Sequence, residues 1–207
     1  MPPKSKPMTQ TEIQALWDYA LSCCADVSHG EGHLRRVLAG ALKLADHYPA
    51  ADRDVLTAAA ILHDCAQGEQ RRDPRVHHAA EGAKKAQAFL LRQGYDPAFS
   101  QRVSDVIAAH SSPTMASDAG FEAQLLFDAD KLDMCGAVGL SRALMYALDM
   151  GEALYSAQGE SFFSVANADC DFVEKNLFTS EARRMAEKRL RLSREFLFHL
   201  KDETNTE

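Results

Sequence analysis

The sequence predicts an all-α fold, and three observations support this prediction. Apolar residues recur at helical spacing along almost the whole chain of 207 residues. Prolines, glycines and polar stretches interrupt this pattern, as expected at the ends of helices. No stretch shows a convincing alternation of apolar and polar residues, which a strand with one buried face requires. We therefore expect helices packed around a core, in an arrangement that is not a simple bundle.

In the N-terminal half, the predicted helices carry apolar stripes and are separated by residues that disfavour a helix. They cover residues 9–25, 31–47, 52–64, 76–93 and 97–110. Pro49 breaks the chain after the second helix, and Gly94 ends the fourth. Asp52 begins the third helix, where the helix dipole favours a negative charge, and Pro97 begins the fifth. Residues 67–75 are polar and contain a glycine and a proline, which predicts a loop.

In the C-terminal half, a second loop at residues 111–120 precedes the remaining predicted helices. These helices cover residues 121–133, 135–150, 167–177 and 180–201. Residues 151–163 are expected to be irregular. Because the chain has no repeat and no glycine- or serine-rich linker, we expect a single domain over residues 11–202 after a flexible tail at residues 1–10.

The composition excludes several classes of protein. The hydrophobic share of 46% and the charged share of 26% are ordinary for a globular protein. No apolar run approaches the roughly 20 residues that span a bilayer, and the N-terminal tail lacks the apolar stretch of a secretory signal. With a net charge of −7 and no basic stripe, nucleic acid is not an expected partner. We expect a cytoplasmic protein with no membrane association.

The five cysteines indicate no disulfide framework and no zinc knuckle, because their number is odd and no Cys-x-x-Cys occurs. Their use fits a reducing cytoplasm. Cys65 is interpreted as a small buried apolar residue rather than as a nucleophile.

Two acidic residues and two histidines stand out as candidate metal ligands. His63 and Asp64 follow five apolar residues directly, and Asp130 lies in an apolar helix. Burying a carboxylate in such a place is costly unless it is paired or binds a metal. A single histidine near a helix end, such as His33, is more often a cap or a satisfied core residue. Together, the four side chains form a nitrogen and oxygen set that suits Mn²⁺, Fe²⁺, Co²⁺, Ni²⁺ or Mg²⁺ better than structural zinc.

The order His33, His63-Asp64, Asp130 resembles the H…HD…D signature of the HD-domain phosphohydrolases. The flanking residues resemble this superfamily as well, as His33-Leu34-Arg35-Arg36-Val37, Ala59-Ala60-Ile61-Leu62-His63-Asp64 and Asp128-Ala129-Asp130-Lys131-Leu132-Asp133. The run Gly136-Ala137-Val138-Gly139-Leu140-Ser141-Arg142 is most similar to the YpgQ/YedJ-like bacterial HD hydrolases. The resemblance covers roughly residues 26–150.

This resemblance implies an HD-domain helical fold with extra C-terminal helices, and a metal held by His33, His63, Asp64 and Asp130. The implied activity is hydrolysis of a nucleotide-type phosphate or pyrophosphate bond by metal-activated water. Two alternatives stay open. One is a non-catalytic module that binds nucleotides for regulation, and the other is a di-iron oxygenase on the same scaffold. A homodimer also stays open.

Some HD families use two further histidines to bind a second ion, and His78 and His110 are the candidates here. One ion is favoured and two remain open, because these histidines can instead contact a substrate phosphate or a water. Other HD members place a glutamate shortly after the HD pair to position the attacking water, whereas this chain has Gln67 and Gly68. Glu69 lies nearby in a different register. The proton acceptor is therefore expected to be His110, His78 or metal-bound hydroxide.

A phosphate ester requires positive charge beyond the metal. Arg36 lies one turn after His33 and is a candidate substrate contact. Lys131 is a second candidate, although it can instead pair with a carboxylate, since it lies next to Asp130.

Overall fold

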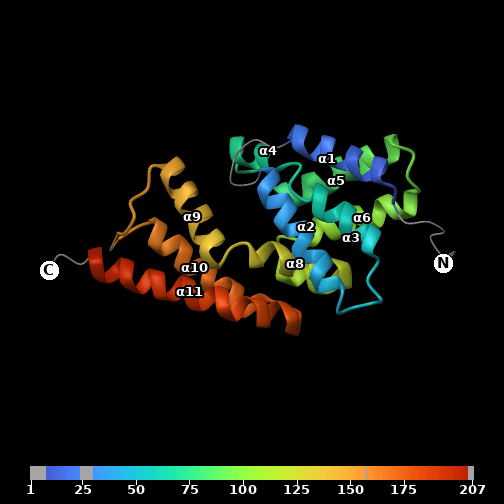
Figure 1. Ribbon diagram of the computed structural model, residues 1–207. Helices are drawn as coiled ribbons and strands as arrows, with labels where there is room; N and C mark the ends of the chain where they lie inside the picture. Colours follow the sequence, from blue (N-terminus) through green and yellow to red (C-terminus); the bar gives the residue numbers. More distant parts are fainter. Residues whose placement is uncertain (1–7, 24–29, 157, 205–207) are drawn as a thin grey trace. The chain divides into compact units, whose positions relative to one another are not determined.

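A computed structural model describes residues 8–23, 30–156 and 158–204. All regular elements in these ranges are helices, which confirms the predicted all-α fold (Figure 1). Most of the predicted flexible tail, residues 1–7, lies outside the described residues. The chain divides into two compact units, Met1–Phe127 and Asp128–Glu207. The expectation of one domain over residues 11–202 stays a prediction.

The first unit is built around α3, the most completely buried of its helices. The elements are α1 (Gln10–Cys23), α2 (Glu31–Ala45), α3 (Arg53–Leu62), α4 (Gln67–Arg72), α5 (His78–Arg92), α6 (Pro97–Ala109), α7 (Pro113–Asp118) and α8 (Phe121–Leu132), which continues into the second unit. Helix α3 packs against α1, α2 and α6, and residues 58–62 are fully buried. The Asp52 side chain caps its first turn by accepting from the backbone N–H groups of Asp54 and Val55. This packing fixes the C-terminal end of α3 inside the unit.

The second unit consists mainly of three helices that pack against one another. They are α9 (Gly136–Met150), α10 (Phe162–Asn176) and α11 (Ser180–Thr204). The apolar core between them contains Leu140, Phe162 and Leu197. The expected extra C-terminal helices are therefore present.

Three segments differ from the sequence predictions. The segments at 67–75 and 111–120, predicted as loops, contain the short helices α4 and α7. Helices of six residues are too short to show an apolar period, so the sequence pattern does not reveal them. Helix α10 begins at Phe162 rather than at Asn167, because Ser161 and Ser164 form a capping box before its first turn.

Among the helices that the structure describes, none combines the length and apolar character needed to cross a membrane.

Candidate metal centre

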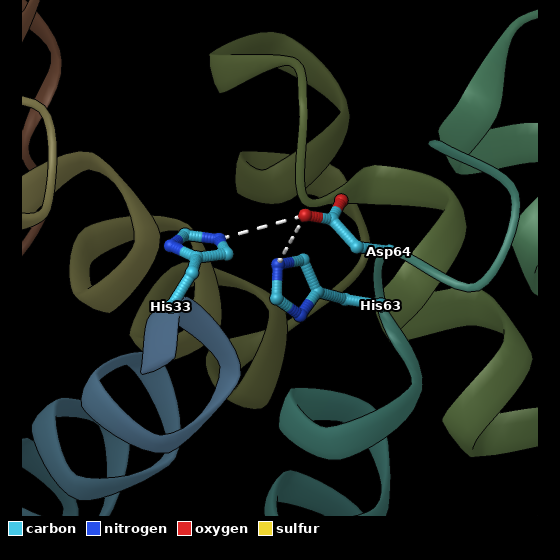
Figure 2. Close-up of side chains that lie close together, drawn as sticks. All are labelled: His33, His63 and Asp64. Carbon is cyan, nitrogen blue, oxygen red and sulfur yellow. Dashed lines mark ion pairs between the residues drawn. The ribbon is translucent and has the colours of Figure 1, made fainter. Parts of the chain in front are cut away.

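The first candidate ligand group lies where the start of α2 meets the end of α3. His33 is the third residue of α2, His63 is the C-cap of α3, and Asp64 follows directly. The Nε2 atoms of His33 and His63 lie 3.5 and 3.4 Å from the same carboxylate oxygen, Oδ2 of Asp64 (Figure 2). Neighbouring ligands of one ion, each about 2.1 Å from it, are roughly 3.0–3.4 Å apart. The three side chains therefore have the spacing of ligands that share an ion.

The hydrogen bonds of His63 fit the role of a ligand. Its Nδ1 lies 2.9 Å from the carbonyl oxygen of Ala60, and a carbonyl only accepts. Nδ1 therefore carries a proton and donates to this oxygen, so Nε2 is the acceptor nitrogen of the neutral ring. Metal-binding histidines are usually held in this way by a carbonyl or a carboxylate. This observation supports a divalent cation as the occupant of the group.

Asp64 provides the negative charge of the site. Burial by itself raises the pKa of this carboxyl. The positive charge of His63 and hydrogen bonds from His33 and His63, when these rings are protonated, outweigh that effect and hold the pKa well below its usual range. Asp64 is thus an anion at neutral pH, although its side chain is only 7% exposed. A buried anion surrounded by imidazoles favours a cation.

A second candidate group shares Asp64 with two other histidines. His78 is the first residue of α5, and His110 is the C-cap of α6. One atom each from Asp64, His78 and His110 lie within 4.8 Å of one another. Oδ1 of Asp64 is 3.8 Å from Nε2 of His110, and the Nε2 atoms of the two histidines are 3.3 Å apart. The structure therefore brings His78 and His110 to the same carboxylate as the first group.

Helix α4 contributes two glutamines, Gln67 and Gln70, to the surroundings of the HD pair. The sequence pattern did not identify Gln70 as a site residue. Gln70 Oε1 accepts hydrogen bonds from both the backbone N–H and Nδ1 of His78, at 2.9 and 2.5 Å. Gln67 Oε1 is buried and has no hydrogen-bond partner among the described residues, so it is an acceptor for a water or ligand. No local pattern marks Gln70, because its partner lies eight residues later in another helix.

Three further residues, Lys85, Cys65 and Arg36, follow or flank the first group in the sequence or in the fold, and they differ in exposure and partners. Lys85 of α5 pairs with Glu69 and also donates to the backbone oxygen of Cys65. Cys65 itself is buried, which agrees with its interpretation as a small core residue. Arg36 is exposed on α2, and its role as a substrate contact stays a prediction.

The remaining predicted site residues lie in the second unit. Lys131 Nζ donates to Oδ2 of Asp130 over 2.7 Å, which is the carboxylate pairing that the sequence left open. Asp133 is buried and forms an ion pair with Arg142 over 3.2 Å. Asp130 stays a predicted metal ligand, and Lys131 stays a predicted substrate contact.

Comparisons with known proteins agree with this architecture. The HD domain model matches residues 30–135. A crystal structure from Lactobacillus plantarum has 25% sequence identity and a TM-score of 0.76, and covers 96% of this chain and 99% of that chain. Bacillus subtilis YpgQ, solved in complex with ADP, has 23% identity and a TM-score of 0.77, over 95% of this chain and 96% of its own.

A predicted HD superfamily hydrolase from an uncultured Thermotogales bacterium has 26% identity and a TM-score of 0.64, over 97% of this chain and 95% of its own. The comparison with curated proteins gave no match. The matched residues 30–135 make up just over half of the chain and include His33, His63, Asp64 and Asp130. This chain therefore belongs to the HD domain family.

Proposed function

We propose that this protein is a divalent-metal-dependent phosphohydrolase that cleaves a phosphate or pyrophosphate bond of a nucleotide-type substrate. The convergence of His33 and His63 on one oxygen of Asp64 carries the proposal (Figure 2). The sequence resemblance adds Asp130 as the proposed fourth ligand. The name of the Thermotogales protein supports hydrolysis, and the ADP complex of YpgQ makes nucleotides the first substrates to test.

A divalent cation at this group would make a bound water more acidic and polarise a phosphoryl oxygen. The chain's own residues would then do three things. Asp64 stays ionised and supplies the anionic ligand. The carbonyl of Ala60 keeps the His63 ring oriented with Nε2 toward the carboxylate. Arg36 and Lys131 are proposed to balance the charge of the substrate phosphate.

His110 and His78 are proposed as the groups that receive a proton from the attacking water or contact the phosphate. His110 is buried, and its Nε2 lies 3.8 Å from Oδ1 of Asp64, next to the proposed metal ligands. The chain has no glutamate at Gln67, so a carboxylate base of the kind found in other HD members is absent from that position. This difference favours a histidine as proton acceptor.

The decisive experiment removes one ligand at a time. Purified His63→Ala and Asp64→Ala, supplied with Mn²⁺, Co²⁺ or Ni²⁺, should bind the ion of this group about a hundredfold or more weakly and lose turnover by a similar factor, because a ligand loss exceeds the 10–100-fold effect of losing an outer contact. His47→Ala, an exposed histidine beyond the end of α2, is the matched control and should keep both. Metal is measured by mass spectrometry and turnover by phosphate or pyrophosphate release from nucleoside mono-, di- and triphosphates.

Several outcomes would contradict the proposal. An active Asp64→Ala variant without metal would remove the assigned site. Nucleotide binding without turnover under any metal would support the regulatory alternative. Two irons per chain together with oxygen uptake would support the oxygenase alternative.

A further inference from the structure

Gln70 holds His78 in one orientation. A backbone N–H is always a donor, so the atom of Gln70 that lies 2.9 Å from the His78 backbone nitrogen must be the amide oxygen. The same oxygen is 2.5 Å from His78 Nδ1. Since an amide oxygen only accepts, Nδ1 of His78 must carry a proton and donate to Gln70. The acceptor nitrogen of the neutral His78 ring is then Nε2.

His78 needs a side-chain partner because of its place in its helix. His63 and His110 both stand at helix C-caps, and each donates from Nδ1 to the carbonyl three residues earlier, Ala60 at 2.9 Å and Ile107 at 2.6 Å. His78 is instead the first residue of α5, so no preceding helical turn offers a carbonyl. Gln70 of α4 replaces that carbonyl and also satisfies the His78 N–H, which has no partner within its own helix.

The Nε2 atoms of four histidines therefore form two groups, one at each oxygen of Asp64. Oδ2 of Asp64 faces His33 and His63 (Figure 2). Oδ1 of Asp64 is on the side of His110, 3.8 Å from its Nε2. His110 Nε2 lies 3.3 Å from His78 Nε2, and in the neutral rings both atoms are acceptors. Two acceptors at this distance repel each other unless a cation or a shared proton lies with them. A phosphate oxygen is itself an acceptor, so this arrangement favours a cation over a phosphate.

We propose that Gln70 is a positioning residue for a second divalent cation, bound by Oδ1 of Asp64 and the Nε2 atoms of His78 and His110. Gln70 keeps Nε2 of His78 as the acceptor that faces His110, whereas backbone carbonyls do this for His63 and His110. Loss of the Gln70 amide oxygen allows the His78 proton to move to Nε2, which then cannot bind a cation. This inference rests on the metal chemistry of the proposed function and replaces the proton-acceptor and phosphate-contact roles proposed there for His78 and His110, because a cation would occupy their Nε2 atoms. Its test needs no turnover.

The experiment compares Gln70→Leu with Gln70→Glu in the full chain. Leucine has a similar size and no acceptor, whereas glutamate keeps an oxygen that accepts from Nδ1. Long-range ¹H–¹⁵N NMR of the metal-free proteins reports which ring nitrogen of His78 is protonated, with His78→Ala used to assign its signals. Titration calorimetry with Mn²⁺ measures the affinities of the two ions. Gln93→Leu, at the exposed C-cap of α5, is the matched control.

We expect wild type, Gln70→Glu and Gln93→Leu to bind two ions and to show the proton of His78 on Nδ1. In Gln70→Leu the proton should move toward Nε2, and the affinity for the weaker ion should fall about 10- to 100-fold, as for other partners that orient a metal ligand. The affinity for the stronger ion should change less than about twofold, because His33 and His63 keep their own contacts.

Three results would overturn the inference. The first is a wild-type protein that binds only one ion. The second is a Gln70→Leu variant that keeps both the Nδ1 proton of His78 and the second ion. The third is a Gln70→Leu variant in which the affinities for both ions fall equally. Failure of the proposed function has a different signature, because a protein that binds both ions but hydrolyses no nucleotide would leave the role of Gln70 intact.

Discussion

Cys65, directly after the HD pair, shows how burial decides the chemistry of a single residue. Its Sγ donates to the carbonyl oxygen of Gly82 over 3.4 Å. Burial raises the pKa of this thiol to about 12, and the neighbouring Lys85 only partly opposes the rise. The reactive form of a cysteine is the thiolate. Cys65 is therefore inert at neutral pH despite its position in the motif.

The buried thiols should resist alkylation in the native protein. At pH 8, a pKa near 12 leaves a thiolate fraction of only about 10⁻⁴ at Cys65. Iodoacetamide should therefore label the half-exposed Cys23 and leave Cys65 and Cys135 unmodified, and all of them should react in denaturant. Peptide mass mapping measures the labelling. Equal labelling rates at Cys65 and Cys23 in the folded protein would show that the thiol is not protected.

Gly82 has a structural role near the same cysteine. A Cβ atom at this position would lie 3.2 Å from the carbonyl oxygen of His63, which is tighter than most real contacts. The absence of a side chain lets α5 approach the end of α3. His78 is the first residue of the same helix. The close packing at Gly82 therefore also sets the distance between His78 and the HD pair at the end of α3.

At the scale of elements, the start of α9 depends on two glycines of the Gly136–Arg142 run. Gly136 has φ +78°, a backbone conformation that favours glycine, and Ser193 of α11 accepts its N–H over 2.8 Å. Gly139 lies so close to the preceding turn that a Cβ would be 2.2 Å from the carbonyl carbon of Met134. The motif thus allows α9 to begin immediately after α8 in a tight turn.

Gly139→Ala should therefore destabilise the second unit. The added methyl group meets backbone rather than a flexible side chain, so α9 has to move, and we expect a loss of about 1–3 kcal/mol or more in the free energy of unfolding. Gly32→Ala is the matched control, because its nearest neighbour is the flexible end of Arg36 at 3.3 Å. It should be neutral or stabilising by up to about 1 kcal/mol. Urea unfolding followed by circular dichroism measures both; a neutral Gly139→Ala would disprove the close approach.

A buried carboxylate fixes the junction before α11. Asp128 is fully buried and accepts hydrogen bonds from the backbone N–H groups of Phe178 and Thr179 and from the Thr179 hydroxyl, over 2.7–2.8 Å. Burial raises the pKa of Asp128, and these three hydrogen bonds partly oppose the rise. The first aspartate of the Asp128–Asp133 segment is thus a structural residue, distinct from the proposed ligand Asp130.

At the scale of the whole molecule, the part of the chain that matches the HD domain family ends at a different residue from the first compact unit. The match ends at residue 135, whereas the first unit ends at Phe127. The solved structures cover 95–97% of this chain, so their likeness extends over α9, α10 and α11 as well. The C-terminal helices are therefore part of the shared architecture rather than an addition specific to this chain.

A bound cation should stabilise the folded protein as a whole. A ligand that binds only the folded state at about 100 times its Kd adds about 2.7 kcal/mol, which corresponds to a rise in Tm of about 5–11 °C for a chain of this size. Adding Mn²⁺ should raise the Tm measured by scanning calorimetry, and EDTA should reverse it. Asp64→Ala should show no such rise, because both candidate groups share its carboxylate, whereas His47→Ala should respond like the wild type. A wild-type Tm that is independent of Mn²⁺ would argue against the metal site.

The sequence by itself determined the helical class, most helix positions and the identity of the HD family. These features are local, because apolar periodicity, Pro97, the caps and the ordered motifs are each contained in a short stretch of chain. Only the tertiary structure revealed α4, the division of the two Asp64 oxygens between His63 and His110, and the partnership of Gln70 with His78. These depend on side chains from different helices meeting in space, and no periodic pattern in the chain encodes such a meeting.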